Sequence, residues 1–344
     1  MTSDKNLFKA LFLVQLFGSF LVFVGHYTAS ASTHITPTLL ETSLRHLSGY
    51  GTALLATITG FFTALSFEGK KVSGPQFFKG KFFIIYLPFL ISGVVFHWAL
   101  NGGLPSNMSD IANIFLGKTG AHLYFIFMLC QYYIFAYIFK NVITKKTSFY
   151  FLGLFFVIQF FFTKLTLNWY NMGVRHFLLT WIFTIYLGHL LYWYREKVLS
   201  WLLGNKLAAY ILLAVSVTSM GYFTFSDKLY TANHLIFVFS SFTILLTGIT
   251  FLLPNLGYFK KLQFRKGLTF YIYLTHPFFI LYANNYMIRK LGFLWILENK
   301  AFFVVYLFAI YVVTFLFSYT WTGFIQMRAD RRKQARQKAV STAA

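Results

Sequence analysis

Histidine is the residue type in this chain best suited to chemistry, and most of the nine histidines lie in or beside long apolar stretches. An imidazole exchanges a proton near neutral pH, so a partly buried histidine facing a cavity can act as a general base. His26 and His276 lie deepest in their apolar stretches. His122 opens the apolar stretch 121–140. Four other histidines could be tolerated close to water without any role: His97, His176, His189 and His234.

A metal site is the competing interpretation of these histidines. It would need three or four converging ligands, and no two histidines have the helical spacing His-x-x-x-His. Cys130 is the only cysteine, which excludes an internal disulfide and a cysteine-based metal site. We therefore predict that the chain holds no metal.

A basic segment at residues 68–88 is a second chemical feature. It carries Lys70, Lys71, Lys79 and Lys81 ahead of an apolar helix that contains Pro88. These lysines could simply anchor the helix at the membrane surface. Alternatively, ammonium groups and the free N–H groups of a helix start favour phosphate, as found on a coenzyme A thioester.

The elements that position these residues must be membrane-spanning helices. Hydrophobic residues make up 58% of the 344 and charged residues 11%, whereas a soluble domain carries roughly 25% charge. About 20 apolar residues cross the hydrocarbon core. The stretches that qualify are 7–29, 49–67, 79–100, 121–140, 149–168, 176–194, 207–226, 232–253, 267–285 and 302–323. We predict an all-α membrane protein, a bundle of about ten transmembrane helices.

The basic residues predict the orientation of this bundle. The net charge is +22, but most Lys and Arg residues lie in alternate links between spans, as the positive-inside rule requires if both termini are cytoplasmic. No Asp or Glu lies inside a predicted span, which argues against a proton-coupled pump built on buried carboxylates.

The chain reads as one transmembrane domain over residues 1–326, followed by a basic cytoplasmic tail, 327–344. Its first apolar stretch lacks a convincing cleavage site and is interpreted as a retained helix. The basic run in the tail suits anionic membrane lipids, and we expect no nucleic-acid partner.

Six short motifs occur in order along residues 7–290 and together resemble one family. The segments are Phe23-Val-Gly-His26-Tyr, Thr59-Gly60-Phe61, Lys79-Gly-Lys81 with Pro88, His122-Leu-Tyr-Phe, Trp181-Ile-Phe-Thr-Ile-Tyr-Leu-Gly188, and Tyr271-Ile-Tyr-Leu-Thr-His276-Pro277. With the ten-span layout, they resemble the acyltransferase 3 family of membrane O-acyltransferases. Within it, the chain looks most like the intercellular adhesin C branch, which is associated with poly-N-acetylglucosamine and described both as an exporter and as an O-succinyl-modifying enzyme.

The resemblance implies a reaction in a bacterial plasma membrane. The family moves an acyl group, such as acetyl or succinyl, from cytoplasmic acyl-CoA to a hydroxyl of a cell-surface polysaccharide. Carried over by position, His26 is the expected base, with His122 and His276 as hydrogen-bond donors. Lys79 and Lys81 would hold the CoA phosphates, with Gln15 at the family's arginine position. Tyr27, Tyr124 and Tyr273 would contact the sugar, or simply pack, and Arg175 is a candidate for recognising a carboxylate on the acyl group.

Two departures from the family pattern keep other functions open. Gln15 replaces an arginine, and lysines replace the arginines before Pro88, which keeps the positive charge but loses bidentate phosphate binding. The alternatives to an acyltransferase are therefore a polysaccharide exporter or flippase, and a non-catalytic subunit that binds a glycan synthase.

Overall fold

The computed structural model describes residues 4–68, 73–165, 172–225, 234–259 and 263–343, and their regular structure is helical throughout. In chain order the helices are α1 (Asp4–Ala31), α2 (Leu39–Phe67), α3 (Gly74–Lys81), α4 (Leu87–Asn101), α5 (Met108–Phe115), α6 (Leu123–Phe139), α7 (Ser148–Lys164), α8 (Ile182–Gly204), α9 (Lys206–Thr224), α10 (His234–Asn255), α11 (Leu268–Ala283), α12 (Trp295–Glu298) and α13 (Lys300–Ala343). Lys70 and Lys71 of the basic segment lie outside the described residues.

The predicted class, an all-helical membrane protein, is confirmed. Each predicted span overlaps one of these helices, or the continuous helical stretch Gly74–Asn101 that α3 and α4 form together. Among the described residues, six helical stretches are long and apolar enough to cross a membrane: α1, α2, α3 with α4, α9, α10 and α13. The number of ten spans and the cytoplasmic location of the termini stay predictions.

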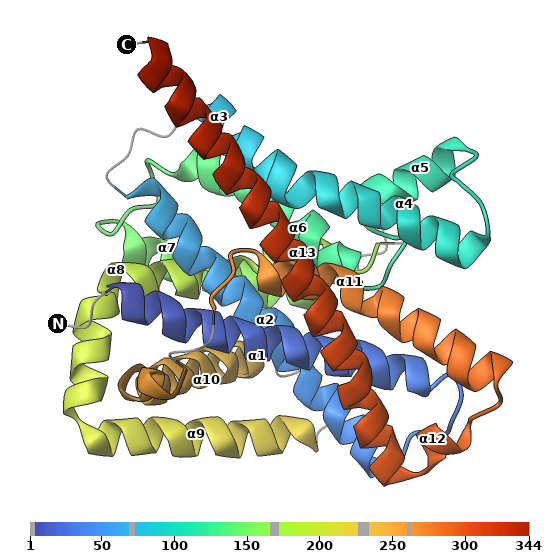
Figure 1. Cartoon of the computed structure of the whole chain (residues 1–344). Helices are drawn as coiled ribbons and strands as arrows, with labels where there is room; N and C mark the ends of the chain where they lie inside the picture. Colours follow the sequence, from blue (N-terminus) through green and yellow to red (C-terminus); the bar gives the residue numbers. More distant parts are fainter. Residues whose placement is uncertain (1–3, 69–72, 166–171, 226–233, 260–262, 344) are drawn as a thin grey trace.

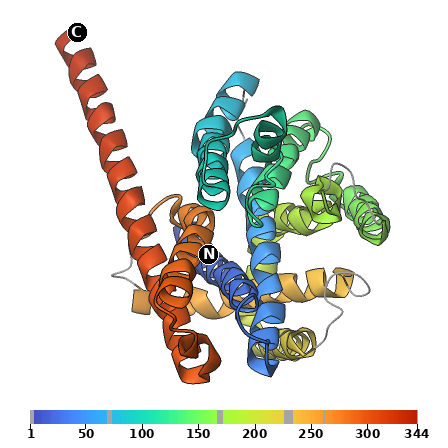
Figure 2. The same cartoon turned by 90° about the vertical axis from the view of Figure 1, so that its right-hand side faces the viewer.

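Helix α2 lies at the centre of the bundle, where it packs against α1, α8, α9 and α10 (Figures 1 and 2). On the other side of α1, α11 packs against both α1 and α13. The 44-residue helix α13 crosses the bundle obliquely, and its last turns project beyond it. The predicted basic tail is therefore a direct continuation of α13. Both ends of the chain lie toward the left of Figure 1.

Glycines allow α2 to approach its neighbours at backbone distance. A Cβ atom placed on Gly51 would lie 2.5 Å from the carbonyl oxygen of Gly18 in α1. Cβ atoms on Gly60 and Gly188 would collide with carbonyl oxygens of α8 and α2, respectively. In a membrane, where helices gain little from hydrophobic exclusion, such close packing is a main source of association. The small residues of 48–66 thus allow close packing of α2 against its neighbours.

A π-helical turn precedes Pro88. This turn, Phe82–Tyr86, joins α3 to α4, and Pro88 occupies the first turn of α4. Proline has no N–H to donate and clashes with the preceding turn of a regular helix. The wider π turn accommodates this defect without interrupting the membrane-length helix.

A buried carboxylate lies in α2 ahead of the predicted span 49–67, which itself contains no Asp or Glu. This helix begins at Leu39, ten residues before the predicted span, because Thr38 and Glu41 form a capping box. Glu41 is 2% exposed, and its Oε1 lies 2.6 Å from Nζ of Lys300 at the start of α13. The ion pair lets the carboxylate remain charged in a buried position and joins α2 to α13.

The glycine contact between α2 and α8 gives the first testable prediction. Replacing Gly188 with alanine places a Cβ against the backbone of Thr57, and overpacking of this kind costs about 1–3 kcal/mol. Gly153→Ala in α7 is the matched control, because no atom lies within 4 Å of the new Cβ. We expect a lower apparent melting temperature in detergent for G188A only. Equal melting temperatures would contradict the close contact.

Candidate active site

Three histidines from distant parts of the chain meet within the bundle. His26 comes from α1, His122 precedes the first residue of α6, and His276 comes from α11. The ring centroids of His26 and His276 are 5.0 Å apart, those of His122 and His276 5.6 Å, and those of His26 and His122 5.9 Å. The three imidazoles therefore form one cluster, here called the histidine cluster.

The rings of the histidine cluster differ in exposure and in hydrogen bonding. His122 and His276 are fully buried, whereas His26 is partly exposed. Nδ1 of His276 lies 3.0 Å from the carbonyl oxygen of Ile272, which assigns the hydrogen to Nδ1 and leaves a lone pair on Nε2. Nε2 of His276 and both ring nitrogens of His122 form no well-defined hydrogen bond, although the Leu274 carbonyl lies near His122.

Unpartnered nitrogens of this kind are costly in an apolar interior. Burying a polar group without a hydrogen bond is unfavourable, and most buried polar groups in proteins are paired. Two such rings beside the partly exposed His26 are the arrangement expected of a site that completes its hydrogen bonds with a ligand. His276, with its lone pair on Nε2, and the partly exposed His26 form an imidazole pair that can accept, hold and return one proton.

Aromatic rings enclose the histidine cluster. Phe96 lies 4.9 Å from His122 between ring centroids, and Phe23 lies 6.1 Å from His276. Tyr273 contacts both buried histidines, at 5.8 and 5.9 Å, and its hydroxyl donates to the backbone carbonyl of His122 at 2.6 Å. This bond ties α11 to the start of α6, so the two buried imidazoles keep a fixed relative position.

The backbone around the histidine cluster explains how the rings are placed. A Cβ on Gly25 would collide with Ser48 of α2, so glycine beside His26 allows α1 and α2 to lie close together at this level. In α11, Pro277 follows His276 and lacks the N–H that would bond to the Tyr273 carbonyl. A helix with this interruption can turn the imidazole back toward its own carbonyls.

A basic cavity of about 500 Å³ reaches Tyr273 from the other direction. Its walls include Lys81, Lys266, Gln15 and Tyr133. Nζ of Lys81 lies 4.1 Å from the ring centroid of Tyr133, a cation–π contact that holds the ammonium group without neutralising its charge. A second cavity of about 710 Å³ shares Gln15 and Lys266 with the first and adds three cationic residues, Lys5, Lys9 and Arg265.

Comparison with known proteins identifies the family of this chain. Residues 9–321 match the acyltransferase domain that defines the acyltransferase 3 family. The chain belongs to the acyltransferase 3 family. Proteins of this family are multi-pass membrane proteins, as the apolar helices of this chain indicate.

The chain is also similar to curated relatives from Staphylococcus aureus. In strains MSSA476 and MRSA252 these are named "Probable poly-beta-1,6-N-acetyl-D-glucosamine export protein". Each is 26% identical over 262 residues, which cover 70% of this chain and 71% of the relative. No solved structure matches the chain.

The structure places the family-derived anion-binding residues in two different settings. Lys81 and Gln15 line the basic cavity. Lys79 is exposed and is not among the residues that line it. Residues two apart on a helix point to nearly opposite faces, so only one of these two lysines can face the cavity.

The predicted sugar-contacting residues are likewise separated. Tyr27 is fully buried, and its hydroxyl donates to the carbonyl of Phe303 at 3.0 Å, so its placement is that of a packing residue. Tyr124 lies 5.5 Å from His176, between ring centroids, outside the histidine cluster. Arg175 is exposed beside His176, and its carbonyl accepts a hydrogen bond from Trp181 at 3.0 Å. Of the four predicted substrate-binding residues, only Tyr273 contacts the histidine cluster.

Sequence reasoning missed two cations of the site, Lys266 and Arg265. They were interpreted only as part of the positive-inside pattern, although they lie directly before the helix that carries His276. Their position directly before this helix is the feature of the sequence that could have identified them. Across the described residues, no group of three His, Cys, Asp or Glu side chains is arranged to hold a metal ion.

The bond from Tyr273 to the His122 carbonyl can be tested directly. Tyr273→Phe keeps the ring and removes the hydroxyl, leaving a buried carbonyl without its donor, which typically costs about 1–3 kcal/mol. Tyr282→Phe, an exposed tyrosine of the same helix, is the control. We expect thermal unfolding in detergent at a lower temperature for Y273F than for Y282F. An unchanged value for both would show that the bond does not hold α11 to α6.

Proposed function

We propose that this acyltransferase 3 protein is an O-acyltransferase that moves an acyl group from acyl-CoA to a hydroxyl of a cell-surface polysaccharide. The observation that carries the proposal is the position of Tyr273, which lines a cavity with Lys81 and Lys266 in its walls and contacts the two buried imidazoles of the histidine cluster. The cavity suits a phosphorylated donor, and the imidazoles suit proton transfer. Acyl transfer needs both donor binding and proton transfer, and the cavity and the histidine cluster both adjoin Tyr273.

The donor binds, in this proposal, in the basic cavity. Lys81 and Lys266 face it and would attract the CoA phosphates, with Lys5, Lys9 and Arg265 at the adjoining cavity. Gln15 and His26 are eleven positions apart on α1, a rise of about 16 Å at 1.5 Å per residue. The thioester end of the donor would extend along this part of α1, and the Tyr273 ring must turn aside to admit it.

Each imidazole then has a distinct role in the proposed reaction. His26, the partly exposed ring, accepts the proton of the sugar hydroxyl while the hydroxyl oxygen attacks the thioester carbon. His122 donates a hydrogen bond to the carbonyl oxygen as it becomes negatively charged. The C–S bond then breaks, and the CoA thiolate takes the proton from His26, which leaves a sugar ester and free CoA.

His276 is better suited to accepting a hydrogen bond than to donating one. Its Nδ1 hydrogen is directed at the Ile272 carbonyl, so Nε2 presents a lone pair. In the proposal this nitrogen orients the sugar hydroxyl or shares the proton held by His26. The proposal does not choose between acetyl and succinyl. Arg175, the candidate for recognising the carboxylate of a succinyl group, lies apart from the histidine cluster.

Binding of the donor should depend on the lysines that face the cavity. Lys81→Gln and Lys266→Gln each remove a charged contact to phosphate, worth about 1.5–3 kcal/mol, or roughly 10- to 100-fold in affinity. We expect weaker acetyl-CoA and succinyl-CoA binding by isothermal titration in detergent. Lys206→Gln, an exposed lysine away from both cavities, is the control, and Lys79→Gln should behave like it. A loss with K79Q alone would contradict the assignment of the cavity.

Turnover should depend on His26. Removal of a general base lowers rates by about 10²–10⁴-fold. We therefore expect His26→Ala to abolish acyl transfer to oligosaccharide while retaining acyl-CoA affinity and thermal stability. Transfer at the wild-type rate by a folded H26A protein would eliminate this role.

Export is a second candidate, favoured by the name of the staphylococcal relatives. The same H26A variant separates the two functions in cells. An acyltransferase predicts that polysaccharide still reaches the surface without its ester groups. An exporter predicts that polysaccharide accumulates inside cells lacking the protein while acyl groups on any exported material are unchanged.

A further inference from the structure

A separate pocket lies between α2, α6, α7 and α8, away from the histidine cluster. It has a volume of about 170 Å³, slightly larger than engineered cavities of about 150 Å³ that bind benzene. Its walls are mainly aromatic and aliphatic side chains, including Phe67, Phe135, Phe155 and Trp193. Such walls suit hydrocarbon, and the pocket shares no residue with the basic cavity.

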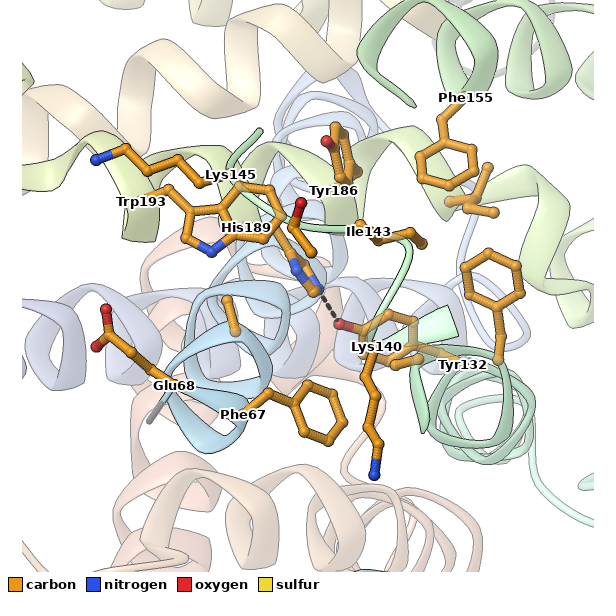
Figure 3. Close-up of a pocket in the computed structure, with 15 residues that line it drawn as sticks. Phe67, Glu68, Tyr132, Lys140, Ile143, Lys145, Phe155, Tyr186, His189 and Trp193 are labelled. Atoms are coloured by element: carbon orange, nitrogen blue, oxygen red, sulfur yellow. Dashed lines mark hydrogen bonds between the residues drawn. The ribbon is translucent and has the colours of Figure 1, made fainter. Parts of the chain in front are cut away.

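A buried histidine, His189 of α8, is among the polar side chains that line this pocket. It is 7% exposed, and its Nε2 lies 2.6 Å from the hydroxyl of Tyr132, as Figure 3 shows. With the phenol assigned as the donor to Nε2, the single N–H of the neutral imidazole lies on Nδ1, and this buried nitrogen has no partner among the described residues. An oxygen acceptor on a ligand would satisfy it, because an unpaired buried N–H is unfavourable.

Charged residues line the rim of the pocket. Lys140 and Lys145 extend from the link between α6 and α7 toward its edges, and Glu68 lies at the end of α2 (Figure 3). Nζ of Lys140 lies 3.8 Å from the ring centroid of Tyr137, and Nζ of Lys145 lies 5.3 Å from that of Tyr194. A cation–π contact leaves the positive charge of an ammonium group in place, and the described residues at the rim comprise these two lysines and one carboxylate.

We propose that this pocket binds an anionic membrane phospholipid. An acyl chain enters between the aromatic rings, an ester oxygen accepts the Nδ1 hydrogen of His189, and the phosphate lies at Lys140 and Lys145. Basic pockets between helix ends on the cytoplasmic side of a membrane suit anionic lipid headgroups, and the predicted topology places both lysines on that side. A sugar fits the walls less well, since His189 Nδ1 is the one unpartnered buried polar atom among the lining residues described.

The position of the pocket gives the lipid a role in the fold. His189 directly follows Gly188, whose contact with Thr57 sets the approach of α8 to α2. A ligand that fills the pocket therefore supports the α2–α8 contact from one side. Because a ligand bound only to the folded state stabilises it by mass action, anionic lipid should raise the melting temperature of the delipidated protein.

The test uses the full chain, delipidated in detergent, with phosphatidylglycerol and phosphatidylcholine of identical chains. Native mass spectrometry should show a retained phosphatidylglycerol, and the melting temperature should rise with phosphatidylglycerol only. The double variant Lys140→Gln/Lys145→Gln should weaken this binding roughly tenfold or more, since each cation near an anionic surface adds attraction. Lys146→Gln is the matched control, because this exposed neighbour is not a lining residue.

A second pair of variants tests the interior of the pocket. His189→Phe keeps a ring but removes the N–H donor, and Ala136→Phe fills the space with a larger side chain. Both should reduce phosphatidylglycerol retention while the rim charges remain. Equal retention of both lipids, binding unaffected by the double lysine variant, or displacement of the lipid by N-acetylglucosamine oligomers or by palmitoyl-CoA at equal concentration would overturn the proposal.

Discussion

The close contact of α2 with α1 and α8 is the constraint on which the rest of the structure depends. Between apolar helices in a bilayer, association relies on backbone approach, and Gly18, Gly51, Gly60 and Gly188 provide it. Helix α1 carries His26, so its distance from α2 fixes the position of the partly exposed imidazole. Helix α8 carries His189 directly after Gly188. The histidine cluster and the pocket at His189 are thus both positioned through the same central helix.

The histidine cluster combines polarity with enclosure in a way that favours proton chemistry. Its rings lie among Phe23, Phe96 and Tyr273, which exclude water, yet several ring nitrogens form no well-defined hydrogen bond with the protein. Some other buried polar groups of the bundle are paired: Glu41 with Lys300, and Gln159 with the Phe183 and Thr184 backbone. Others, such as the Tyr192 hydroxyl, form no hydrogen bond among the described residues, so the histidine cluster is distinguished by having three such nitrogens on two adjoining rings.

Tyr273 joins the two halves of the proposed active site. It lines the basic cavity, contacts both buried imidazoles, and is bonded to the His122 backbone. In the proposed active site, a donor in the basic cavity and the imidazoles that transfer the proton therefore adjoin the same side chain. Family membership and this geometry support acyl transfer together, whereas the name of the 26% identical relatives supports export.

The amino-acid sequence by itself determined the helical membrane class, because the length of an apolar stretch and the charge of a link are local properties. It also supplied the three histidines, through motifs that resemble the family. Only the tertiary structure decided which neighbours in sequence share a site: Lys81 faces the cavity and Lys79 does not, and His26 joins the cluster while Tyr27 packs against Phe303. The physical reason is helical geometry. Adjacent residues point in different directions, and the face that meets a cavity depends on how α1, α3, α6 and α11 are rotated against one another, which no single stretch of sequence specifies.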